Sequence, residues 1–414
     1  MDAESRNPCS SQKERRKGRD KMQVSKTEID EYIARHGEEM VEFLSEVLKV
    51  PSVTGDELAV SLVLKKRVER MGLTVETIGV SEDRPNLIAA WQGPQDGPSF
   101  LFNGHMDVFP PVPEEAPEVS WSGKIEDGFV HGRGASDMKG GDCAALMAVE
   151  MLRALGFEPH GRITLSFMCD EEAGGKKGGK YLIEKGLLRA DFGICMEPSN
   201  MDLILGHTGI YRCYLNFYGT PASSYRPHPS MDALEKCVLA AEALYQLRDE
   251  IQKRKDPVFG CPSLSVTTLH AGTATNVFAT EARLSLDRRL IPGETHEQAE
   301  REIRDVLAVL EDRYPEFSYE LELISDRPFL QTEPDSAVAK AISRANWQIF
   351  GKPVTMRYRH GGSDAASIFG AFGTQIPNIG PGQEAECAKA DEKIRIKDYL
   401  DMIKIYALTL LELM

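Results

Sequence analysis

Apolar residues recur at helical spacing near the start of the chain, in the stretch SKTEIDEYIARHGEEMVEFLSEVLKVP. Ser25 and Glu28 have the S-x-x-E spacing of a capping box, in which each residue satisfies an N–H group at the start of a helix. Pro51 follows the last apolar residue and cannot continue the helix. The pattern therefore predicts a helix that begins after Ser25 and stops before Pro51.

Short apolar runs then alternate with an amphipathic segment. The runs SFLFNGHMD, RITLSFMCDEE and DFGICMEPS are typical of strands. Between the first two lies the small-residue segment MKGGDCAALMAVEMLRALG, which predicts a helix closed by Gly156. Strands separated by helices indicate an α/β sheet covered on both faces.

The pattern changes over residues 209–325. A strand (IYRCYLNFYG) is followed by a long helix (SMDALEKCVLAAEALYQLRDEI), two strands (SLSVTTLHAG and EARLSLDRRL) and a further helix (THEQAEREIRDVLAVLEDRY). A β-α-β-β-α-β order of this kind predicts a ferredoxin-like α+β unit. We expect it to be inserted into a discontinuous α/β domain made of residues 22–208 and 326–414.

Composition and charge exclude some partners. The chain is 42% hydrophobic and 27% charged, with a net charge of −15. An acidic protein is a poor match for nucleic acid or for an anionic membrane surface. No apolar run approaches the roughly 18 residues that span a bilayer. Residues 1–21 carry charges with no apolar stretch behind them, which predicts a disordered tail rather than a signal peptide.

The cysteines indicate the compartment. Eight of them are scattered along the chain with no C-x-x-C pair. Free and mostly buried thiols suit a reducing environment better than a disulfide framework does. We therefore expect a cytoplasmic protein.

Acidic and imidazole side chains gather where the predicted strands end. Four motifs carry them: His105 and Asp107 in NGHMD, Asp137 in GRGASDMKGG, Glu171 and Glu172 in CDEEAGG, and Glu197 in CMEPS. Each motif alone is more often solvated surface. Ligands of open α/β sheets bind at the carboxyl ends of strands, so all four can converge on one crevice. One imidazole with several carboxylates suits Zn²⁺, Mn²⁺ or Co²⁺.

The G-H-x-D, D-M-K-G, D-E-E and M-E-P motifs, in this order, resemble the metal-dependent aminoacylases and carboxypeptidases. That family includes acetylornithine deacetylase, succinyl-diaminopimelate desuccinylase, aminoacylase and glutamate carboxypeptidase. The resemblance covers residues 25–414. It implies a zinc-peptidase-like catalytic domain with an inserted lid or dimerisation domain, a small-molecule substrate and a homo-oligomer.

The resemblance also implies roles for the motif residues. Asp137 would bridge two metal ions; the first would also bind His105 and Glu197, and the second Glu172 and a C-terminal histidine. Glu171 would be the general base.

Asp107 would hold the ring of His105. A carboxylate next to a ligating imidazole fixes its tautomer and orientation.

The C-terminal histidine is missing from GPGQEAECAKADEKI, residues 380–394. Family members end with G-P-G and then A-H-x-x-D-E, and alignment on DEKI places Ala388 at the histidine position. The last histidine in the chain is His360. Cys387 could ligate as a thiolate if the loop shifts, or be a buried thiol beside the cleft. We expect one well-formed site per subunit, for Mn, Zn or Co.

A second histidine is missing from the inserted domain. Family members carry G-x-x-A-H-S, whose histidine reaches the partner subunit's active site and is thought to stabilise an oxyanion. Here the stretch is YGTPASSYRPH, with Ser223 at the histidine position and Arg226 and His228 as possible substitutes.

Three further positions match substrate-contacting positions of the family: Asn276 in GTATNVF, Arg289 in LDRRLIPGE and Gly362 in GGSDAAS. Arg289 is either a surface salt-bridge partner or a clamp on a substrate carboxylate, for which the planar guanidinium is well shaped.

Three functions fit these observations, and a metal-dependent hydrolase of C–N bonds covers two. The leading specific hypothesis is hydrolytic deamination of an aromatic amino acid, as in 5-nitroanthranilic acid aminohydrolase, a relative from aromatic compound catabolism. Hydroxide there adds to a ring carbon, so no carbonyl oxyanion forms and both missing histidines have one cause. The alternative is an N-acyl-amino-acid deacylase or dipeptidase. The third is a pseudo-enzyme that binds without catalysis, against which the retained base Glu171 argues.

Overall fold

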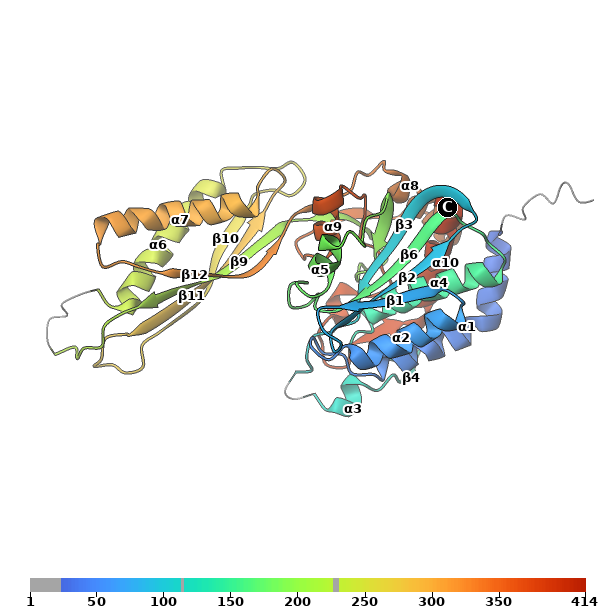
Figure 1. Cartoon of the computed structure of the whole chain (residues 1–414), viewed down its shortest axis with the longest axis horizontal. Helices are drawn as coiled ribbons and strands as arrows, with labels where there is room; N and C mark the ends of the chain where they lie inside the picture. The colour runs from blue at the N-terminus through green and yellow to red at the C-terminus, as the bar shows by residue number, and fades with distance from the viewer. Residues whose placement is uncertain (1–23, 113–114, 226–230) are drawn as a thin grey trace, which may run out of the picture.

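The computed structural model describes residues 24–112, 115–225 and 231–414, which form two bodies (Figure 1). We call them the large domain and the inserted domain; strands β9 and β12 connect them. The predicted tail, residues 1–21, lies outside the described residues. Within the described part of the chain, no helix is both long and apolar enough to cross a membrane.

The first helix confirms the prediction from its capping box. Helix α1 spans Lys26–Leu48. The backbone N–H of Glu28 donates to Ser25 Oγ at 3.3 Å, and that of Ser25 donates to Glu28 Oε2 at 2.8 Å. Its apolar stripe is buried in the main core of the large domain.

A five-stranded mixed sheet forms the centre of the large domain, in the order β1-β2-β6-β3-β7. The strands are β1 (Thr74–Gly79), β2 (Pro85–Gln92), β3 (Gln95–His105), β6 (His160–Met168) and β7 (Phe192–Cys195). Strand β3 is parallel to both β6 and β7. Their carboxyl ends therefore lie next to one another at one edge of the sheet.

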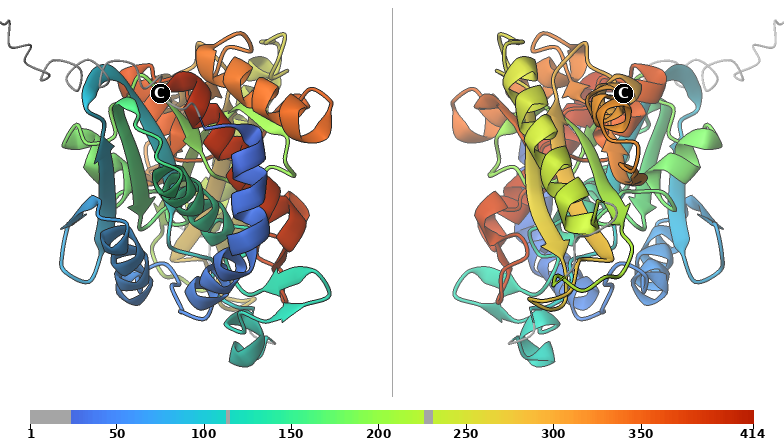
Figure 2. Two further views of the ribbon diagram at one scale, coloured as in Figure 1. Left: turned by 90° about the vertical axis from the view of Figure 1, so that its right-hand side faces the viewer. Right: turned by 90° about the vertical axis from the view of Figure 1, so that its left-hand side faces the viewer.

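Helices cover both faces of this sheet, as the alternation of strands and helices predicts. Phe100 and Phe102 face the core that contains α1, whereas Leu101 between them faces the opposite core, because side chains alternate along a strand. Figure 2 shows α4 between the sheet and α1. The helices with residues in the α1 core are α2 (Leu58–Arg70), α4 (Lys139–Ala154), α8 (Ala337–Phe350) and α10 (Ile396–Leu413); those of the opposite core are α5 (Gly179–Glu184) and α9 (Ala365–Phe372).

Two small sheets and two short helical segments complete the large domain. One sheet has the order β13-β8-β14 and the other β15-β5-β4. Their strands are β8 (Leu203–His207), β13 (Leu330–Gln331), β14 (Met356–Arg359), β4 (Ile125–Glu126), β5 (Phe129–His131) and β15 (Lys393–Arg395); the short helical segments are α3 (Pro117–Ser120) and η1 (Glu384–Glu386).

The inserted domain has the predicted ferredoxin-like fold. Its four strands are antiparallel, in the order β10-β11-β9-β12, and pack with two helices around a separate core. The elements are β9 (Gly209–Tyr218), α6 (Ala233–Ile251), β10 (Ser263–Ala271), β11 (Glu281–Leu290), α7 (His296–Arg313) and β12 (Glu320–Arg327).

Candidate metal centre

Strand ends bring the motif residues together, as the topology requires. His105 is the last residue of β3, Glu171 and Glu172 follow β6, and Glu197 follows β7. These three strands are neighbours in the sheet.

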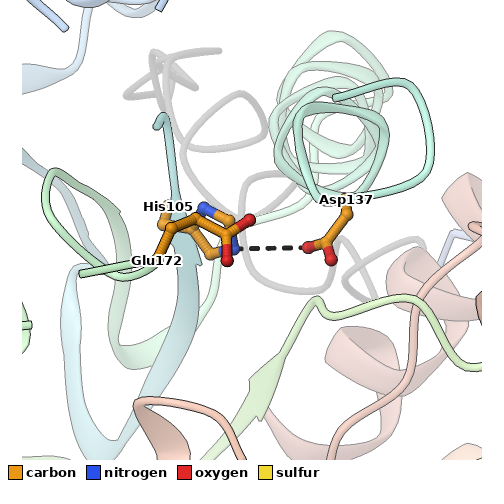
Figure 3. Close-up of side chains that lie close together, drawn as sticks. All are labelled: His105, Asp137 and Glu172. Atoms are coloured by element: carbon orange, nitrogen blue, oxygen red, sulfur yellow. Dashed lines mark ion pairs between the residues drawn. The ribbon is translucent and has the colours of Figure 1, made fainter. Parts of the chain in front are cut away.

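Asp137 enters the site from the loop before α4. Helix α4 approaches the end of β7 closely: a Cβ on Gly141 would lie 2.2 Å from the main-chain oxygen of Met196. Only glycine fits there. The close contact sets Asp137 opposite the imidazole, with His105 Nε2 3.4 Å from Asp137 Oδ1 (Figure 3).

Two groups of three ligand atoms meet at this point. Atoms of His105, Asp137 and Glu172 lie within 4.8 Å of one another, and so do those of His105, Glu171 and Glu197. His105 belongs to both groups, and its Nε2 is also 3.9 Å from Glu197 Oε1. The structure thus collects the expected ligands and the expected base in one cluster.

The cluster carries more buried negative charge than its own cations balance. Burial and the charge of Asp137 raise the pKa of Glu172 to about 11 and that of Glu197 to about 8. Burial lowers the pKa of His105, but its ion pair with Asp137 and the charge of Glu171 outweigh burial and hold that pKa well above its ordinary value.

Two oxygens of the cluster also lack partners. Among the described residues, Asp137 Oδ1 and Glu172 Oε1 are buried without a hydrogen bond. Buried polar atoms are normally satisfied. A divalent cation would satisfy both oxygens and offset the charge, so these residues fit a metal ion.

Asp107 contacts the imidazole ring of His105 through its main chain, whereas the expectation was a contact through its carboxylate. His105 Nδ1 is 2.8 Å from the main-chain oxygen of Asp107 and 3.6 Å from its carboxylate. The carboxylate instead accepts the N–H groups of Glu171 at 3.0 Å and Glu172 at 3.2 Å, and the hydroxyl of Thr54 at 2.8 Å. It therefore orients the D-E-E turn, while the peptide carbonyl selects the tautomer of His105 that carries its proton on Nδ1. Burial raises the pKa of Asp107 to about 6.

Arg327, the last residue of β12, is a site residue that sequence reasoning missed. Its guanidinium forms an ion pair with the Glu171 carboxylate and donates to the main-chain oxygen of Glu171. Asp364 Oδ1 lies 3.8 Å from the same guanidinium. Arg327 thus joins the inserted domain to the predicted base. No local pattern announces a contact between residues 156 positions apart.

The cluster opens into a cleft of about 590 Å³. Arg359, at the end of β14, lines it together with Gly362 and Glu384. Arg359 Nη2 donates to Glu197 Oε2 at 3.2 Å and Nη1 to the main-chain oxygen of Pro198 at 3.0 Å. Its Nε is buried and has no partner among the described residues. Like Arg327, Arg359 was not predicted from the sequence as a site residue.

Three of the described residues that were predicted to contact substrate do not line this cleft. Arg289 binds Asp287 at 2.7 Å and the main-chain oxygen of His360 at 2.8 Å, which matches the salt-bridge alternative. Arg289 is not one of the described residues that line the cleft.

Ser223 and Asn276, two further predicted contacts of the inserted domain, lie together and do not line this chain's own cleft. Ser223 Oγ is 3.5 Å from the main-chain oxygen of Asn276. Neither is among the described residues of the cleft wall. Gly362 does line the cleft, and Arg226 and His228 lie outside the described residues.

At the C-terminal motif, Cys387 rather than Ala388 faces the ligands. Cys387 lines the cleft with Asp137 and Glu172, whereas Ala388 is exposed with a left-handed φ of 57°. Burial and the charge of Asp137 raise the pKa of the Cys387 thiol, and its Sγ is 3.6 Å from the main-chain oxygen of Gln383.

The sequence from residue 101 to residue 412 matches the profile of "Peptidase family M20/M25/M40". The chain belongs to this family. It is a metal-dependent hydrolase acting on C–N bonds.

Curated relatives of this M20 family member include desuccinylases. Succinyl-diaminopimelate desuccinylase of Psychromonas ingrahamii is 29% identical over 386 residues, which are 90% of this chain and 97% of the relative. The enzyme of the same name from Stutzerimonas stutzeri is 31% identical over 388 residues, covering 90% and 97%.

Solved structures agree on the fold. An M20 family metallo-carboxypeptidase from Sulfolobus solfataricus superposes with a TM-score of 0.77 at 20% identity, covering 90% of this chain and 99% of that one. A dipeptidase from Saccharomyces cerevisiae gives 0.74 at 15% identity, covering 94% and 99%.

Proposed function

We propose that this M20 hydrolase cleaves the amide bond of a small substrate bearing a carboxylate, such as an N-acyl amino acid or a dipeptide. The observation that carries this proposal is the cleft itself, in which the carboxylates around His105 share a wall with Arg359, whose Nε has no hydrogen bond among the described residues. The likeness to desuccinylases supports the same substrate class.

We assign the chemistry to metal ligands, a general base and two residues that position the base. His105, Asp137 and Glu197 would hold a divalent ion, which supplies Lewis-acid chemistry to water in such sites, and Glu172 would belong to the incomplete second position. Glu171 takes the proton of the attacking water and returns it to the leaving nitrogen. Arg327 keeps the Glu171 carboxylate in place, and Asp107 fixes its backbone.

We assign Arg359 two roles that the sequence analysis had given to other residues: binding the substrate carboxylate and stabilising the oxyanion. A guanidinium binds a carboxylate through two parallel hydrogen bonds, which suits a substrate clamp. It also places a cation near the scissile bond, where an oxyanion needs stabilising in the absence of a histidine at position 223.

A second candidate is the deamination of an aromatic amino acid such as 5-nitroanthranilate. Ser223 and Ala388 favour it, because two histidines used in amide hydrolysis are replaced at once. Hydroxide attack on a ring carbon needs neither of them.

A single set of assays separates the two candidates. Metal-loaded protein is incubated with N-succinyl and N-acetyl amino acids, dipeptides and aminobenzoates that include 5-nitroanthranilate. Release of a free amino acid from the acyl substrates supports amide hydrolysis. Ammonia from an aminobenzoate, without amide cleavage, overturns it in favour of the aromatic reaction.

Arg359→Met should raise KM for the carboxylate-bearing substrate about 10- to 100-fold, because a charge-assisted hydrogen-bonded pair is lost. For an analogue whose carboxylate is replaced by a neutral amide, the same change should leave KM almost unaltered, whereas loss of oxyanion stabilisation should lower kcat for both compounds. KM and kcat are measured for both compounds, with metal content determined in parallel because Arg359 also touches Glu197.

The neighbouring Arg357→Met is the matched control. Arg357 lines the same cleft but is held by Asp202 at 2.9 Å and Glu384 at 2.7 Å, so KM should change by less than about threefold. Equal effects of both changes would remove Arg359 as the clamp.

Cys387→His should raise the metal content from about one ion per chain to about two, because an imidazole there would join Asp137 and Glu172 as a third ligand. Metal is counted by mass spectrometry after dialysis. Ala388→His, one residue away and exposed, should stay near one ion. Two tightly held ions in the unaltered protein would refute the one-metal proposal and make Cys387 a ligand.

The homo-oligomer stays a prediction, with one feature of the inserted domain in its favour. Leu234, Val238 and Tyr245 on α6 are 43%, 50% and 41% exposed. Spacings of four and seven residues place them on one side of the helix. An exposed apolar stripe is typical of an interface between subunits.

A further inference from the structure

The loop that presents Asp137 is held by a carboxylate from the far end of the chain. Glu392 Oε1 accepts the backbone N–H groups of Ser136 at 2.9 Å and of Asp137 itself at 3.0 Å. Glu392 is 1% exposed and stands just before β15. Sequence reasoning used it only to align the DEKI segment.

Glu392 is itself fixed on its other side. Its Oε2 accepts from Arg133 Nη1 at 3.3 Å, and Arg133 also binds Glu115 at 2.6 Å. The main-chain oxygen of Glu392 accepts the N–H of Gly132 at 2.8 Å. The carboxylate is thus tied to both ends of the segment that leads into Asp137.

This arrangement constrains where the Asp137 carboxylate can lie. The peptide N–H groups on either side of Ser136 both point at one oxygen, so the loop cannot rotate without breaking two hydrogen bonds. Asp137 Oδ1 is 3.4 Å from His105 Nε2 but accepts no hydrogen bond among the described residues, so the backbone of the loop decides where this oxygen lies. Charge-assisted bonds to a buried carboxylate are stronger than neutral ones, which makes Glu392 a strong restraint on this loop.

We propose that Glu392 is a positioning residue for Asp137: it aims the Asp137 carboxylate at His105 and Glu172 and thereby sets the affinity of the site for its metal. The proposal rests on the proposed metal chemistry but is independent of the substrate. Residues behind metal ligands typically contribute about 10- to 100-fold in affinity.

The test is a titration of the metal-free protein with Mn²⁺ and Zn²⁺, by calorimetry or competition with a chelator, alongside a thermal melt. Glu392→Ala should weaken binding about 10- to 100-fold. Glu392→Gln should lose less, because its amide oxygen can still accept one or both N–H groups.

Glu115→Gln is the matched control. It removes the same charge from the same arginine at a buried position, but Glu115 touches neither Ser136 nor Asp137. Its melting temperature should fall, whereas its metal affinity should stay within about twofold of the unaltered protein. If Glu392 acted only on stability, its variants and Glu115→Gln would show the same relation between melting temperature and metal affinity. An equal fall in melting temperature would then be accompanied by an equal loss of affinity.

Unaltered metal affinity in Glu392→Ala would overturn the proposal. If that variant fails to fold, Glu392→Gln decides: affinity equal to that of Glu115→Gln overturns it, and weaker affinity supports it. A chain whose affinity depends on Glu392 but which hydrolyses no tested substrate would remove the proposed function and leave the positioning role standing.

Discussion

Glu171→Gln should lower turnover about 10²- to 10⁴-fold while leaving metal binding unchanged, because an amide cannot take the proton of the attacking water. The change is nearly isosteric, and Gln can still accept from Arg327, whose guanidinium reaches both the side chain and the main chain of residue 171. Measurement of kcat and of metal content on the same sample checks the expectation.

Two results would contradict this role. Turnover within a few-fold of the unaltered protein would show that another group is the base. Loss of metal together with activity would make Glu171 a ligand, a role that the group formed with His105 and Glu197 allows geometrically.

His105→Ala should abolish metal binding and activity together. His105 contributes the one imidazole to both groups of ligand atoms, so neither group keeps three members without it. The loss of affinity should exceed the roughly 10- to 100-fold typical of residues that only support a ligand. Equilibrium dialysis against Mn²⁺ or Zn²⁺ measures it, and a hydrolysis assay follows the activity.

His160→Ala provides the comparison. His160 is exposed at the opposite end of β6 from the D-E-E motif, and its removal should leave both quantities unchanged. A His105→Ala protein that retained stoichiometric metal would show that the carboxylates alone bind the ion, and the assignment of the site would fail.

Local patterns predict this protein well wherever neighbours in sequence decide the outcome. The capping box of Ser25 and Glu28 predicts the start of α1, since the bonds join residues three apart. Period-two and helical runs likewise predict the order of elements in the inserted domain. The convergence of His105, Glu171 and Glu197 follows from chain order, because parallel neighbouring strands end at one edge.

Local patterns could not predict which side chains from distant segments contact the site residues. Arg327 reaches Glu171 across the junction between the domains, and Glu392 reaches Asp137 across 255 residues. Arg359 stands two residues from Arg357 in the sequence MRYRH, and its place in the cleft depends on how β14 pairs with β8. Arg289, for which the sequence left a salt bridge and a substrate clamp both open, is bound to Asp287 two residues away on the same strand.

The motifs alone determined which chemical groups this protein brings to its site, because a metal hydrolase needs an imidazole, carboxylates and a base, and strand order delivers them. Only the tertiary structure decided how those groups are held. Asp107 supports the ring of His105 through its peptide carbonyl, and the left-handed backbone at Ala388 accompanies an exposed side chain while Cys387 faces the cleft. Such orientations depend on irregular loops whose dihedral angles are set by packing against residues far away in the chain, and no periodicity in the sequence records them.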